Sequence, residues 1–96
     1  MTVEEAKRRF MSAYEWMLKV QQALLFKKFS VEVDHQFTPA NYKEDDVNGW
    51  TVKLTVRDDE ADNIMRAEWT PWYGDEDFLP KKNFIEGYLL AKGINI

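Results

Sequence analysis

Three short runs of acidic residues are the most prominent groups in this chain that could recognise a ligand or a partner. They are Glu44-Asp45-Asp46, Asp58-Asp59-Glu60 with Asp62, and Asp75-Glu76-Asp77. None matches the calcium-binding loop, which alternates its ligands around a central glycine and closes with a glutamate. We therefore expect no metal site. The runs are interpreted either as solvated turns or as docking points for a protein with a basic surface.

The third acidic run follows two aromatic residues with only Gly74 between them, in the stretch AEWTPWYGDED from residue 67 to residue 77. Pro71 lacks a backbone N–H and should end strand pairing, which places Trp72 and Tyr73 just beyond a strand. If Trp72 is exposed, it forms with Tyr73 the best candidate for an interface hot spot. Packing of Trp72 beneath a C-terminal helix is the alternative. The candidate partner-binding residues are Trp72, Tyr73, Asp75, Glu76, Asp77, Glu44, Asp45, Asp46, Asp58 and Asp59.

Few residues are suited to catalysis or to holding a cofactor. The chain has no cysteine and a single histidine, His35, without a glycine-rich phosphate loop or a nucleophile motif. Asp34 precedes His35, but successive strand residues point to opposite faces, so the two are poorly placed to act together. We expect no catalytic residue and no cofactor. The alternative is a small enzyme or ligand-binding domain with a pocket near His35, Tyr14 and Trp50.

The charge distribution argues against direct binding of nucleic acid. Residues 29–80 carry four basic and thirteen acidic side chains, a net charge of -9, whereas the whole chain has -4. Nucleic-acid affinity depends mainly on lysine and arginine, so an acidic middle should repel a phosphate backbone. The same carboxylates could instead imitate spaced phosphates and occupy the basic groove of a nucleic-acid-handling protein, as an inhibitor would.

The N-terminal part of the chain has the pattern of an amphipathic helix. Thr2 followed by Glu5 fits a capping box, and apolar residues then recur at three- and four-residue spacing up to Leu24. The apolar arc covers more than half of the helix circumference. Trp16 and Val20 lie at one edge of it, where a second helix or a second copy of the chain could cover them. A homodimer through this first helix is one interpretation.

Three strands and a second helix should follow. Residues 29–37, 50–57 and 64–70 alternate polar and apolar side chains, and they place Phe29, Phe37, Trp50 and Trp69 on the apolar side. Helical spacing resumes after the GDED run, with Pro80 in the first turn and Gly93 as the stop. The order predicts an α+β fold, α-β-β-β-α, whose antiparallel meander carries both helices on one face. In a meander the run at 58–62 lies at the opposite end of the sheet from the other two runs.

These observations give one preferred function and two alternatives. We expect a single domain over residues 1–96, cytoplasmic because no signal peptide or membrane span is apparent. The preferred function is a non-enzymatic protein-binding or regulatory module that acts through its acidic loops. The alternatives are the small enzyme or ligand-binding domain near His35 and a structural subunit that works by homo-oligomeric assembly.

Overall fold

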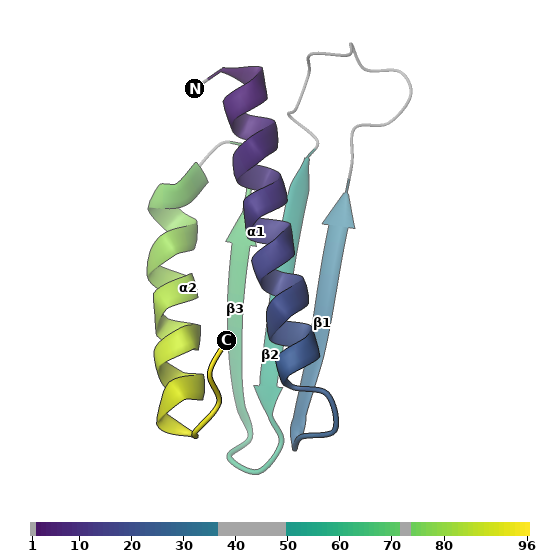
Figure 1. Cartoon of the computed structure of the whole chain (residues 1–96), viewed down its shortest axis with the longest axis vertical. Helices are drawn as coiled ribbons and strands as arrows, with labels where there is room; N and C mark the ends of the chain where they lie inside the picture. Colours follow the sequence, from purple (N-terminus) through teal and green to yellow (C-terminus); the bar gives the residue numbers. More distant parts are fainter. Residues whose placement is uncertain (1, 37–49, 72–73) are drawn as a thin grey trace.

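The computed structural model (Figure 1) describes residues 2–36, 50–71 and 74–96 and confirms the α-β-β-β-α order. The elements are α1 (Val3–Ala23), β1 (Phe29–Gln36), β2 (Thr51–Asp58), β3 (Asn63–Trp69) and α2 (Gly74–Ala91). The strands form one antiparallel sheet in the order β1-β2-β3, and the inward side chains of β2 and β3 share one core with the buried side chains of both helices. Neither described helix combines the length and the apolar character that a bilayer span requires.

Helix α1 begins as the sequence predicts. The Thr2 hydroxyl accepts a hydrogen bond of 3.1 Å from the backbone N–H of Glu5, which satisfies one of the free donors at the helix start. The face at three- and four-residue spacing is buried and consists of Ala6, Phe10, Ala13, Trp16, Met17 and Val20. This face packs on the sheet, with the Phe10 ring 5.2 Å from Trp50 and 6.1 Å from Trp69.

The alternation in β2 and β3 places one set of side chains entirely inside. The inward residues of the two strands are all 5% exposed or less, namely Val52, Leu54, Val56, Met65, Ala67 and Trp69. Both helices lie on one face of the sheet (Figure 1), and the opposite face presents mostly charged and polar side chains. Its cross-strand partners include Asp34 with Lys53, Lys53 with Glu68 and Thr55 with Arg66. The prediction that the strand aromatics face inward is thus confirmed for Trp69, and Phe29 and Trp50 are partly buried; Phe37 lies outside the described residues.

Strand β1 is less well covered than β2 because it lies at the edge of the sheet away from α2, which packs beside β3 (Figure 1). Its inward residues Phe29, Val31 and Val33 are only half-buried, and His35, which shares their parity, is exposed. The alternation of the strand alone would make this a packed histidine, which the structure does not bear out. The His35 ring instead lies at the margin of the helix layer, with its centroid 5.1 Å from that of Tyr14.

Helix α2 begins earlier than the sequence suggested. It starts at Gly74, so Pro80 is the seventh helical residue and not part of the first turn. Asp75, Glu76 and Asp77 form the first turn of the helix, where carboxylates interact favourably with the helix dipole, and do not lie in a loop. Gly74 has φ of 55°, a left-handed value that glycine adopts readily, and its N–H donates to the carbonyl of Thr70.

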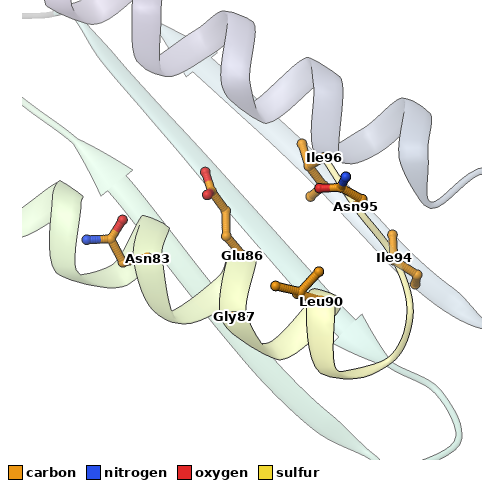
Figure 2. Close-up of a pocket in the computed structure, with 7 residues that line it drawn as sticks. All are labelled: Asn83, Glu86, Gly87, Leu90, Ile94, Asn95 and Ile96. Carbon is orange, nitrogen blue, oxygen red and sulfur yellow. The ribbon is translucent and has the colours of Figure 1, made fainter.

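The end of α2 follows the prediction and turns the chain back on itself. Gly93 has φ of 81°, its N–H donates to the Leu90 carbonyl, and the Ile94 N–H donates to the Leu89 carbonyl. This is a glycine-dependent helix stop. Figure 2 shows the result, because the last three residues run back between α2 and α1, and Ile94 packs partly into the core.

The broad apolar arc of α1 is only partly used inside the chain. Trp16 and Val20 are 7% and 0% exposed, and the Trp16 ring meets that of Phe78 in α2 edge to face at 5.6 Å. No second copy is needed to cover this edge. On the other flank Met11, Leu18 and Leu25 are 41%, 39% and 55% exposed. A dimer through the first helix, which stays a prediction, would therefore use this second flank, and a mass that rises with concentration would reveal it.

Candidate functional site

Asp58, one of the predicted partner-binding residues, is buried at the end of β2. Its carboxylate is bound from two sides. Oδ2 accepts a hydrogen bond of 2.6 Å from the Tyr88 hydroxyl and lies 3.0 Å from the Lys92 Nζ, while Oδ1 accepts from the backbone N–H groups of Glu60 and Ala61 at 3.1 and 3.2 Å. With 1% of its surface exposed, Asp58 cannot meet a partner. It instead fastens the β2–β3 turn to the end of α2, and we call these three side chains, Asp58, Tyr88 and Lys92, the Asp58 clamp.

The clamp changes the proton affinity of all three side chains. The hydrogen bonds from Tyr88 and Lys92 lower the pKa of Asp58 from 3.8 to about 2, more than burial raises it. The hydrogen bond to Asp58 raises the pKa of Tyr88 and that of Lys92. At neutral pH the clamp therefore holds an ionised aspartate, a neutral phenol and a charged lysine.

The depressed pKa of Asp58 predicts a loss of stability in acid. A carboxyl whose pKa is lower in the folded protein contributes stability above its unfolded pKa of about 4, and that contribution disappears as the pH falls towards 2. We expect the difference in urea midpoint between the wild type and Asp58→Asn to be constant from pH 7 to pH 5 and to shrink between pH 4 and pH 2. A difference that stays constant down to pH 2 would contradict this assignment.

Asp75, a second predicted partner-binding residue, also serves the fold. Its Oδ1 accepts a hydrogen bond of 3.2 Å from the Trp69 indole N–H, and its Oδ2 lies 2.7 Å from Arg9 Nη1. Arg9 also pairs with Glu5 at 2.9 Å, and this hydrogen bond lowers the pKa of Glu5 and raises that of Arg9. Asp75 thereby joins α1, β3 and α2 at the end of the sheet opposite to the Asp58 clamp (Figure 1).

The remaining described acids of the candidate set face solvent. Glu76 and Asp77 are exposed on the first turn of α2, where Asp77 lies 3.7 Å from Lys81. Asp59 is exposed in the β2–β3 turn, accepts a hydrogen bond from Ser30 and lies 4.0 Å from Arg57. The two groups lie at opposite ends of the sheet, as the meander predicted (Figure 1). Trp72, Tyr73, Glu44, Asp45 and Asp46 lie outside the described residues.

The residues proposed for an alternative enzyme or ligand site share one region of α1 and the sheet. The Tyr14 ring lies against His35, and Lys7 Nζ is 5.4 Å from the Trp50 ring centre. Among the described residues, no three histidine or acidic side chains are arranged to hold a metal ion. Within the described part of the chain, the pKa shifts belong to the Asp58 clamp, the Arg9 pairs and an Arg57–Asp62 pair, all of them away from His35.

One groove lies between α2 and the returning C-terminal residues (Figure 2). Its walls are formed by Asn83, Glu86, Gly87, Leu90, Ile94, Asn95 and Ile96. Glu86 is the single charged side chain among these residues, and it lies 3.9 Å from Lys82. The side chains of the groove therefore offer one carboxylate and two amides beside apolar groups.

A second groove lies where the outer side of α2 meets β3. It is lined by Asn63, Ile64, Met65, Arg66, Pro80, Lys81 and Phe84. Ile64 is 48% exposed and Phe84 is 61% exposed, so both contribute apolar surface to this groove. We call this feature the β3–α2 groove.

Sequence reasoning did not identify the Asp58 clamp or the β3–α2 groove. Asp58 looked like one member of an acidic turn, and its partner Tyr88 is 30 residues away. The available signal was the parity of β2, because Asp58 continues the inward series Val52, Leu54 and Val56. In the groove, Ile64 was an apolar residue on the otherwise polar parity of β3.

Comparisons of this chain with protein-family models, with curated proteins and with solved structures found no match.

Proposed function

We propose that this chain is a non-enzymatic protein-binding module whose acidic groups dock on a basic surface of another protein. The observation that carries the proposal is the division of the described acids into two kinds. Asp58 and Asp75 are used inside the fold, whereas Glu76 and Asp77 leave their carboxylates exposed on the first turn of α2. Exposed charges of one sign steer a partner of the opposite sign and contribute to specificity.

The use of the titratable groups supports a binding role over catalysis. Catalytic sites gather groups of shifted pKa around a cavity. Here Asp58, Tyr88, Lys92, Glu5 and Arg9 have shifted pKa values, and each is explained by a bond that fastens a helix or a turn. Their shifts therefore have structural causes.

Charge reversal of the exposed acids is expected to weaken partner binding. We would capture partners from the native cell with the wild-type chain, identify them by mass spectrometry and measure affinity for the variant Glu76→Lys with Asp77→Lys. Surface charge changes of this kind should lower affinity ~10-fold or more, and rising salt should weaken wild-type binding steeply. Asp75 is left intact because its replacement would disturb Trp69 and Arg9.

The matched control is Glu32→Lys with Glu68→Lys, which makes the same change in net charge on the open face of the sheet. Both residues are exposed and belong to strands. If the two double variants lose the same affinity, net charge alone explains the loss. That result would contradict a docking role for the start of α2. If the partner handles nucleic acid, duplex DNA should compete with the chain for it, and lack of competition would contradict charge imitation.

A further inference from the structure

The free edge of β3 offers hydrogen-bonding groups to a further strand. Within the described residues β3 pairs with β2 on one side, and the sheet ends at β3 on the other. An edge strand presents a row of backbone N–H and C=O groups that another extended chain can pair with. Proteins commonly block such an edge with a covering helix or loop, with proline or with inward-pointing charges.

Helix α2 borders this edge and does not close it. At 100° per residue, Lys81 and Phe84 fall on one flank of α2, with Lys81 next to the buried stripe of Phe78, Ile85 and Leu89 and Pro80 farther round the helix. That flank reaches the edge of β3, since it lines the β3–α2 groove together with Ile64 and Arg66, whose parity places them on the opposite face of the sheet. Figure 1 shows α2 running beside β3 along the margin of the sheet. The space beside β3 is thus bounded by one strand and one helix.

The chemistry of the groove is apolar with positive charge. Ile64 and Phe84 supply exposed apolar surface, and the two charged residues of its lining, Arg66 and Lys81, are both basic. Lys81 has a weak i,i+4 partner in Asp77 at 3.7 Å, whereas Arg66 has no ion pair among the described residues. The groove therefore favours an apolar segment that carries a carboxylate.

A second copy of this chain does not fit the same edge. Two β3 strands that pair across a two-fold axis would lie about 4.8 Å apart, whereas packed helices need about 8–10 Å between axes. Because α2 lies along the β3 edge in each copy, the two α2 helices would compete for the space above the new strand pair. A single extended segment brings no such helix.

We propose that the β3–α2 groove binds an extended segment of another protein, which adds a fourth strand to the sheet beside β3. In this arrangement an acidic side chain of the segment lies beside Arg66. An apolar residue two positions away meets Ile64 on the same face, and the apolar residue between them points beneath Phe84. The groove adjoins the acidic start of α2 at the Lys81–Asp77 pair but is lined by other residues, so it adds a second binding site to the proposed function.

The probe is a display library of random 12-residue linear peptides, selected against the full chain. We expect enriched peptides to share an acidic residue within two positions of two apolar ones. A synthetic copy of the best peptide should shift the amide resonances of residues 63–69. Its affinity should fall ~10-fold or more in Arg66→Glu and in Phe84→Ala, since truncated anchors at an interface cost this much. Both side chains are exposed, so these variants should fold.

Two controls separate strand addition from other modes of binding. Two peptides are compared, one N-methylated at its odd-numbered amides and one at its even-numbered amides. Only one of the two should lose binding, because only alternate amides of an added strand face β3. Glu32→Lys on the outer face of β1, and Glu76→Lys at the start of α2, should leave the affinity unchanged. Three results would overturn the proposal. They are the absence of any enriched peptide, an equal loss of affinity in the two N-methylated peptides, and self-association of the chain that Phe84→Ala removes.

Discussion

Replacing Asp58 with alanine is expected to lower the melting temperature by about 10 °C. The substitution removes a carboxylate that receives hydrogen bonds from Tyr88 and from two backbone N–H groups and that lies 3.0 Å from Lys92. Leaving buried donors without an acceptor lowers the free energy of unfolding by more than the hydrogen bond itself contributed. Thermal unfolding followed by circular dichroism at pH 7 measures the effect.

The neighbouring acid provides the control for this prediction. Asp59 follows Asp58 directly but is exposed, so Asp59→Ala should change the melting temperature by less than about 3 °C. Tyr88→Phe removes only the Tyr88 hydroxyl that donates to Oδ2. The double variant Tyr88→Phe with Asp58→Ala should lower the melting temperature by less than the sum of the two single changes. Similar melting temperatures for Asp58→Ala and Asp59→Ala would show that the clamp does not stabilise the fold.

Truncation of Trp69 to alanine should have a larger effect still, about 3–5 kcal/mol in the free energy of unfolding. The side chain is fully buried, packs against Phe10 and donates to Asp75, so its loss leaves a cavity and removes the donor to Asp75 Oδ1. Domains of this size are stable by about 5–15 kcal/mol, so the variant should be largely unfolded in low urea. Urea titration with fluorescence detection gives the free energy.

A conservative change separates packing from hydrogen bonding at this position. Trp69→Phe keeps much of the apolar volume but removes the indole N–H that donates to Asp75, and it should cost about 1–2 kcal/mol. Asp75→Ala removes the same hydrogen bond and also the Arg9 pair, so the double variant should cost more than Trp69→Phe but less than the sum of the two single changes. If Trp69→Ala unfolded no more readily than Trp69→Phe, the position would not be the core anchor described here.

Much of the fold follows from short-range patterns in the sequence. The alternation Val52, Leu54, Val56 predicts which side of β2 is buried, and the structure places all three at 0% exposure. The Thr2 cap is equally local, because the hydroxyl and the N–H that it satisfies are three residues apart. Such features depend on neighbours along the chain, and the sequence contains them in full.

The start of α2 could not be predicted because it depends on distant residues. Proline favours a first turn, which led us to place Pro80 there, yet the helix extends six residues further back. Asp75 accepts from Trp69 and pairs with Arg9, and these bonds hold the first turn against β3 and α1. Arg9 is 66 residues from Asp75, a separation that spacing rules do not reach.

The candidate binding residues were predictable as a class but not one by one. Clusters of acidic residues suggested solvent-facing carboxylates, which holds for Glu76, Asp77 and Asp59. It fails for Asp58 because its carboxylate is bound inside the fold by Tyr88. That residue belongs to α2, which lies beside β3 and is distant from Asp58 in the sequence. The β3–α2 groove was out of reach for the same reason, since Ile64 and Phe84 become neighbours only through tertiary packing.

The bonds of Asp75 and Asp58 fasten both ends of α2 to the rest of the chain. A helix held at one end frays from the other, and its amide protons then exchange with solvent long before those of the sheet. With both ends held, the amides in the middle of α2 should exchange at rates close to those of β2, as one cooperative unit. Removing the bonds of either Asp75 or Asp58 should uncouple α2 from the sheet. Helix α2 would then open by itself while the amides of the strands stay protected from exchange.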